Sequence, residues 1–114
     1  MKKTIQIREV AGSEFCVAQE DGERLHDVIV AALEQGTVAL SLEDVAMLTT
    51  PFIRAAIGEM YSRFSEERLQ SSLSLENISS DNLAVFKFVV DDIKRRLRDP
   101  ESYDRSRRHA LELA

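Results

Sequence analysis

Hydrophobic and polar residues follow two periods along this chain, and each period marks one type of element. A period of two predicts strands at Thr4–Val10 and Thr37–Leu42, and a short strand at Leu73–Ile78. A break around Gly12 is followed by the apolar run Phe15–Ala18, which predicts a second strand that forms a hairpin with the first. The sequence therefore predicts about four strands.

A helical period of apolar residues predicts three helices between and after these strands. The first covers Asp21–Gln35 and stops at Gly36, because glycine readily adopts the left-handed conformation of a helix C-terminus. The second covers Thr50–Phe64. The third covers Ser79–Leu97 and ends before Pro100, whose ring clashes with a continuing helical backbone.

The order β(β)αβαβα predicts a single small α/β domain. Strands joined through a helix run parallel with right-handed crossovers, and a hairpin would add an antiparallel pair. We therefore expect a mixed, roughly four-stranded sheet packed with helices mostly on one face. The domain is expected to cover residues 1–98, and residues 99–114 are expected to form a charged tail or a short helix.

Composition places the chain among cytoplasmic globular proteins. Its 114 residues, 44% hydrophobic and 31% charged, can bury one core without disulfides or metals. No run of roughly 18 apolar residues predicts a membrane span, and the N-terminus lacks the apolar stretch of a signal peptide. The single cysteine, Cys16, excludes an internal disulfide and fits a reducing compartment.

The net charge of −5 is unevenly distributed. Residues 94–114 hold seven basic and four acidic residues, so of the 15 basic and 20 acidic residues in all, residues 1–93 hold eight and sixteen. An acidic body repels phosphates and disfavours general nucleic-acid binding. The basic C-terminal segment is the exception, although cations are also favoured there by the dipole of the last helix.

Residues that could carry catalysis or bind a cofactor are few and scattered. Cys16 lies among apolar residues, and a cysteine in such a setting behaves as a small hydrophobe. His26 is expected on the solvent face of the first helix, and His109 lies in the tail. The sequence has no metal-ligand spacing and no phosphate-binding glycine loop. We therefore predict no catalytic residues, no cofactor and no metal.

An ordered set of segments between Ser13 and Leu97 carries a resemblance to a known family. The segments are Gln19–Gly22 with Leu25 and Ile29, Val38–Leu42, Val45, Leu48–Phe52, Ala56–Gly58, Tyr61 and Leu73–Ile78. Together they resemble the STAS-like domain family (DUF4325), bacterial relatives of the anti-sigma-factor antagonists. The resemblance implies an α/β fold and a regulatory role in protein–protein interaction.

In the broader superfamily, a Ser or Thr at the start of the second helix is phosphorylated, and the partner is a histidine-kinase-like ATPase. Alignment on the preceding strand puts Pro51 at the phosphorylated position and Thr49 where Asp is usual, with Phe52 in place of Gly. The Asp-Ser-Ser-Gly signature is absent, which leaves Thr49 and Thr50 as shifted candidates. Thr50 also suits a helix N-cap and Pro51 the first helical position, and both roles can coexist with a switch.

The leading hypothesis is a non-enzymatic interaction module that docks a histidine-kinase-like ATPase through Thr49, Thr50, Phe52 and Arg54. One alternative is a nucleic-acid accessory protein that uses the basic C-terminal segment. An enzyme acting through Cys16, or through the adjacent carboxylates Glu43-Asp44, Glu66-Glu67 or Asp91-Asp92, is a third alternative. No membrane partner is expected, and homo-oligomerisation stays open.

Overall fold

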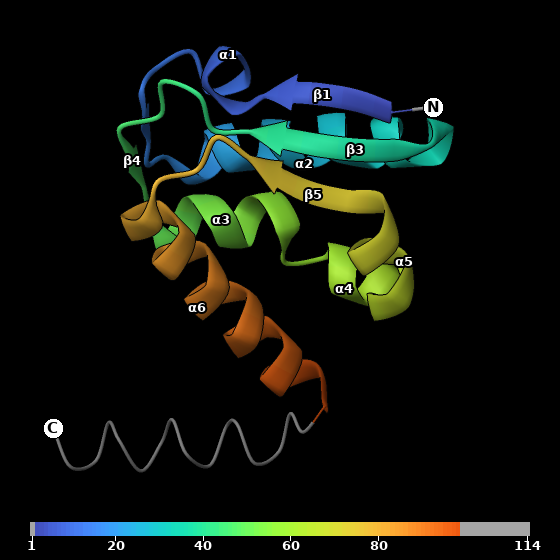
Figure 1. Ribbon diagram of the computed structural model, residues 1–114. Coiled ribbons are helices and arrows are strands. Elements are labelled where there is room, and N and C mark those ends of the chain that lie inside the picture. Colours follow the sequence, from blue (N-terminus) through green and yellow to red (C-terminus); the bar gives the residue numbers. More distant parts are fainter. Residues whose placement is uncertain (1, 99–114) are drawn as a thin grey trace, which may run out of the picture.

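The computed structural model describes residues 2–98. The elements in chain order are β1 (Lys2–Gln6), α1 (Ile7–Ala11), β2 (Phe15–Cys16), α2 (Gln19–Gln35), β3 (Thr37–Ser41), β4 (Met47–Leu48), α3 (Thr50–Ile57), α4 (Met60–Arg63), α5 (Glu66–Ser72), β5 (Leu73–Glu76) and α6 (Ser80–Arg98). Figure 1 shows the sheet above α3 and α6, with α2 behind it. The predicted tail, residues 99–114, lies outside the described residues.

β3 is the central strand of a parallel three-stranded sheet with the order β1-β3-β5. Ile5 and Leu40 are register partners, and both side chains are buried in the hydrophobic core. On the other face Thr4 and Ser74 flank Ala39, and both are exposed. The helices therefore lie mainly on one face of the sheet. The predicted small α/β domain is confirmed.

The prediction of a mixed sheet with a hairpin is wrong in detail. β2 does not pair with β1 but runs parallel to β4 in a separate two-stranded sheet, here called the ribbon. The strand predicted at Thr4–Val10 ends at Gln6, because the chain turns into α1 and Gly12 closes that helix with a φ of 74°. Ile7 and Ala11 lie four residues apart and are both buried on one side of α1. The helix forms because this burial outweighs the strand preference of the short apolar–polar alternation.

The second predicted helix is divided into two. α3 ends at Ile57, and α4 begins at Met60 after a turn. A further helix, α5, follows where the sequence pattern indicated no element. The Ser65 hydroxyl accepts a hydrogen bond from the Arg68 N–H at 3.1 Å, and two glutamates occupy the first turn. This cap was visible in the sequence as a serine followed by acidic residues.

The core lies between the inner face of the sheet and α2, α3 and α6. α2 packs closely on α3, because a Cβ atom at Gly22 would lie only 2.4 Å from the Phe52 carbonyl oxygen. Gly36 ends α2 as predicted, although its φ of 153° and ψ of −145° lie outside the left-handed helical region. The largest fully buried side chains are Phe52, Ile7, Leu25, Ile29, Leu33, Leu40, Ile53, Ile57, Met60, Val38, Val89 and Cys16.

Candidate functional site

The start of α3 is tied to the ribbon by two hydrogen bonds of Thr49. Its N–H donates to the Cys16 carbonyl at 3.2 Å, and its hydroxyl donates to the Val17 carbonyl at 3.1 Å. Thr49 is the N-cap residue, Thr50 is the first helical residue and Pro51 follows it. The predicted N-cap at Thr50 is therefore wrong by one residue. The Thr49 side chain makes no capping hydrogen bond, since its hydroxyl donates to the carbonyl of Val17, the residue after β2.

The other two predicted site residues differ in their accessibility. Phe52 is 1% exposed and belongs to the core, so its side chain is not available to a partner on this surface. Arg54 has a side chain that is 35% exposed and forms an ion pair with Asp92 of α6. The structure thus leaves Thr49 and Thr50 both partly exposed at the start of α3. It buries Phe52 in the core, and the ion pair of Arg54 joins α3 to α6.

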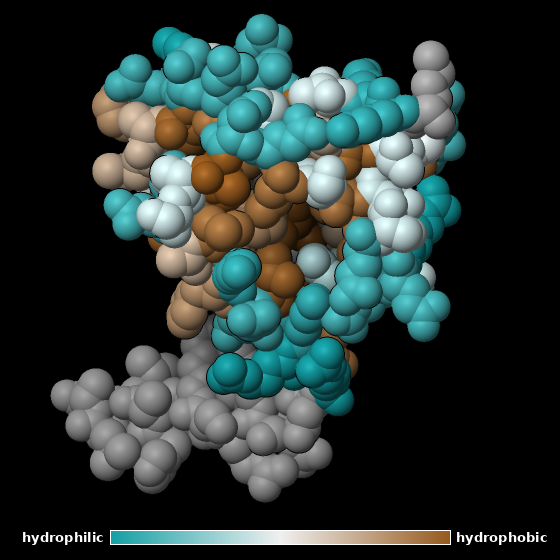
Figure 2. All heavy atoms as spheres, viewed as in Figure 1, coloured by the Kyte–Doolittle hydropathy of each residue, from teal (hydrophilic) through white to brown (hydrophobic). Residues whose placement is uncertain are grey.

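An exposed apolar surface lies beside Thr49, and the sequence analysis missed it. Phe15, Val17 and Met47 are 50%, 43% and 48% exposed. Phe15 and Met47 are register partners in the ribbon, and the Val17 carbonyl accepts the Thr49 hydroxyl. We call these three residues the ribbon patch. Figure 2 shows apolar atoms at this edge of the molecule, over the position of β4 in Figure 1.

The alternation of Phe15 and Val17 with buried Cys16 was a signal for this patch. Because successive side chains of a strand point to opposite faces, only one set can enter the core. Large exposed apolar side chains that lie together mark interaction sites more often than isolated ones do.

A family profile described as a STAS-like domain of unknown function (DUF4325) matches residues 21–83. The match covers more than half of the chain and runs from the first turn of α2 to the first turn of α6. The chain belongs to the STAS-like family. No curated protein and no solved structure matched the chain.

The family match divides the candidate site of this STAS-like domain. Thr49, Thr50 and Met47 lie inside the matched residues, whereas Phe15 and Val17 precede them. The match is also shorter than the predicted resemblance, which extended from residue 13 to residue 97. The family description assigns no function, so the chemistry of the site rests on the residues themselves.

Cys16 and His26 both have structural surroundings in this STAS-like domain. Cys16 is fully buried, and burial raises the pKa of its thiol, which disfavours the reactive thiolate. His26 is not on the solvent face as predicted. Its Nδ1 lies 3.3 Å from the Ala56 carbonyl oxygen, and its Nε2 lies 3.8 Å from a carboxylate oxygen of Glu59. In residues 2–98, no three His, Cys, Asp or Glu side chains are grouped as metal ligands would be.

Part of the basic C-terminal segment is engaged by an acidic side chain. Lys94 and Arg98 contact the two carboxylate oxygens of Glu66 at 2.9 and 3.7 Å. The side-chain hydrogen bond from Lys94 is the main reason that the pKa of Glu66 is lowered. Arg105, Arg107 and Arg108 lie outside the described residues. Across residues 2–98, the helices are too short or too polar to cross a membrane.

Proposed function

We propose that this STAS-like domain is a non-enzymatic interaction module whose partner docks on the ribbon patch and the adjoining start of α3. The observation that carries the proposal is the exposure of Phe15, Val17 and Met47 beside Thr49. Burying such side chains at an interface removes apolar area from water, and aromatic residues and methionine are enriched at interfaces. The resemblance to anti-sigma-factor antagonists supports a histidine-kinase-like ATPase as the partner.

The structure changes which residues should test this surface. An Arg54→Glu substitution would place a carboxylate against Asp92 and destabilise the junction of α3 and α6. Phe52→Ala would open the core. Neither variant separates lost docking from lost folding. Phe15 and Met47 are about half exposed and can be changed with less effect on the fold.

We expect the double substitution Phe15→Ser and Met47→Ser to weaken capture of the partner at least tenfold, because hot-spot residues lose about 2 kcal/mol or more on truncation. The measurement is affinity capture from source-cell extract, with mass spectrometry of the retained proteins. Phe88→Ser is the matched control, since Phe88 is 65% exposed but lies on α6. Equal capture by the double variant and the control would refute the ribbon patch. If the bait alone were recovered, the proposal that this domain is an interaction module would be refuted.

Within this proposal, Thr50 is the better phosphoacceptor of the two threonines. The Thr49 hydroxyl is bonded to Val17, whereas the Thr50 hydroxyl has no hydrogen-bond partner among residues 2–98. A phosphate on Thr50 would lie at the N-terminus of α3 and add a charge of about −1.5 to −2 next to the ribbon patch. The added charge would oppose docking of an apolar or acidic surface.

We expect Thr50→Glu to weaken partner capture and Thr50→Val to preserve it while abolishing phosphorylation. Mass spectrometry of the captured bait should then find phosphate on Thr50 of the wild type. Phosphate found on Thr49 instead, or capture unaffected by Thr50→Glu, would contradict the assignment. Thr37→Glu is the control for added charge, because Thr37 is exposed at the start of β3.

A further inference from the structure

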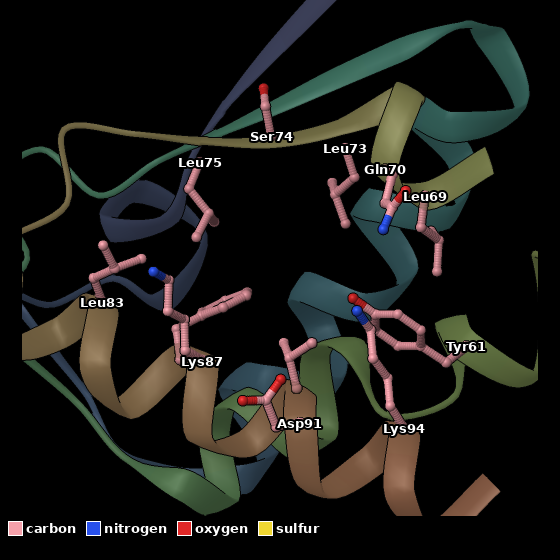
Figure 3. Close-up of a pocket in the computed structure, with 12 residues that line it drawn as sticks. Tyr61, Leu69, Gln70, Leu73, Ser74, Leu75, Leu83, Lys87, Asp91 and Lys94 are labelled. Atoms are coloured by element: carbon pink, nitrogen blue, oxygen red, sulfur yellow. The ribbon is translucent and has the colours of Figure 1, made fainter. Parts of the chain in front are cut away.

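A hollow of about 340 Å³ separates β5 from α6. Its walls are mostly apolar and are formed by Leu69, Leu73, Leu75, Leu83, Phe86 and Val90. Figure 3 shows Leu73 and Leu75 pointing from β5 toward α6, while Ser74 points away. Figure 2 shows brown atoms lining a recess on the same side of the molecule. We call this recess the β5–α6 groove.

The groove is open because its two walls, β5 and α6, pack against different parts of the fold. β5 is an edge strand of the three-stranded sheet, and among residues 2–98 it pairs only with β3. α6 packs on α3 and α4 and is held there by the ion pair between Arg54 and Asp92. The inner face of β5 and the facing side of α6 are therefore both apolar and not packed against each other along the groove.

One end of the groove is polar. Figure 3 shows Tyr61 and Lys94 together at the end nearest α5, and Gln70 next to Leu69 above them. The Lys94 ammonium lies 5.7 Å from the centre of the Tyr61 ring and donates to Glu66 at 2.9 Å. An ammonium carries three donor hydrogens, so Lys94 keeps donors besides the one directed at Glu66. Burial raises the pKa of the Tyr61 hydroxyl, which stays protonated and can donate as well.

The charge of the lining is opposite to that of the whole chain. The ionisable residues that carry charge along the groove are Lys87, Asp91 and Lys94, which give a net charge of +1. The chain as a whole carries −5. An anionic group is therefore attracted to this groove although it is repelled by the protein as a whole. Glu66 does not reverse the sign, since it contacts Arg98 as well as Lys94.

We propose that the β5–α6 groove binds an elongated apolar molecule that ends in a carboxylate, of the chemical class of medium-chain fatty acids. The chain lies between the leucines of β5 and the apolar side of α6, and the carboxylate accepts hydrogen bonds from Lys94 and Tyr61. The volume lies within the usual range for small-molecule sites, which combine mostly apolar walls with a few convergent polar groups. The proposal does not depend on the partner proposed for the ribbon patch.

The direct test is titration of the full chain with decanoate below its micelle concentration, followed by NMR chemical shifts and by calorimetry. We expect saturable binding with shifts at Leu73, Leu75 and Val90. Each buried methylene should tighten binding about fourfold, so octanoate should bind roughly fifteenfold more weakly than decanoate. The absence of saturable binding, or an equal affinity for both acids, would overturn the proposal.

Two substitutions separate the apolar part of the site from its polar end. Val90→Phe fills the groove and should weaken decanoate binding at least tenfold, whereas Phe88→Leu, at an exposed position of α6 outside the groove, should leave it unchanged. Lys94→Gln should weaken decanoate about tenfold but change binding of decanol, the neutral analogue, by less than twofold. Circular dichroism and thermal unfolding check that each variant is folded.

Other occupants of the groove predict different results. If a second copy of the chain were the occupant, the protein would self-associate through the groove and decanoate would not reverse this, which sedimentation at several protein concentrations detects. If the occupant were an extended peptide of another protein, adding decanoate would not change the NMR chemical shift of Val90. Either result would overturn the proposal, as would wild-type affinity in Val90→Phe. Equal loss of decanoate and decanol in Lys94→Gln would overturn the assignment of the carboxylate to the polar end.

Discussion

Replacing Phe52 with alanine is expected to lower the free energy of unfolding by about 3–5 kcal/mol. Phe52 is 1% exposed and is among the largest fully buried side chains of the domain. Its removal takes away the transfer free energy of the ring and leaves a cavity that neighbours such as Ile53 fill only in part. Because small domains are typically stable by about 5–15 kcal/mol, the loss is a large fraction of the total.

Urea unfolding followed by circular dichroism measures this change. Phe52→Leu should cost less, since it keeps most of the apolar volume. Phe88→Ala is the control for loss of a phenyl ring, because Phe88 is 65% exposed and its loss should change stability by less than about 0.5 kcal/mol. If Phe52→Ala were no more destabilising than Phe88→Ala, Phe52 would return to the list of candidate docking residues.

Replacing Gly22 with alanine is expected to destabilise the domain by up to about 3 kcal/mol. The added Cβ would lie 2.4 Å from the Phe52 carbonyl oxygen and 2.8 Å from the Ala55 Cβ. The first contact is with backbone, which cannot rotate away, so α2 and α3 would have to separate. This change in stability is opposite in sign to the effect of the same substitution on an exposed helix surface, where alanine is favoured over glycine by about 1 kcal/mol.

The control for this change is Glu23→Ala, which places alanine at the next position of α2 with an exposed side chain. It should alter the free energy of unfolding by no more than about 0.5 kcal/mol. Both variants can be compared by urea unfolding at one pH. A Gly22→Ala variant as stable as the wild type would mean that α2 and α3 do not approach as closely as the structure has them.

The long periodic segments were predictable because their local pattern and their tertiary role agree. Helix α2 and strand β3 came directly from the apolar positions of Asp21–Gln35 and Thr37–Leu42. The last helix came from the same type of pattern and its cap. The short strands at Phe15 and Leu73 were also predicted, as β2 and β5, but the partner of β2 was not, and β4 was missed. A strand of two residues is too short to specify its partner, which is set by the remainder of the fold.

The candidate site was predicted only in part, for a related reason. The sequence located the turn at Thr49 and Thr50, because strand, turn and proline follow one another there. It could not show that Phe52 points into the core while Arg54 meets Asp92. Both facts depend on where α2 and α6 lie, and Asp92 of α6 is 38 residues from Arg54 along the chain.

The sequence by itself determined the α/β class, the STAS-like resemblance and the position of the α3 turn, because hydrophobic period and turn residues act locally. The tertiary structure alone decided three features. They are the parallel pairing of the ribbon, the exposure of Phe15 and Met47 upon it, and the groove between β5 and α6. Each is formed by segments distant in the chain. Their contacts are selected by how the whole core packs, and a local pattern such as the alternation at Phe15 and Val17 does not decide which face is exposed.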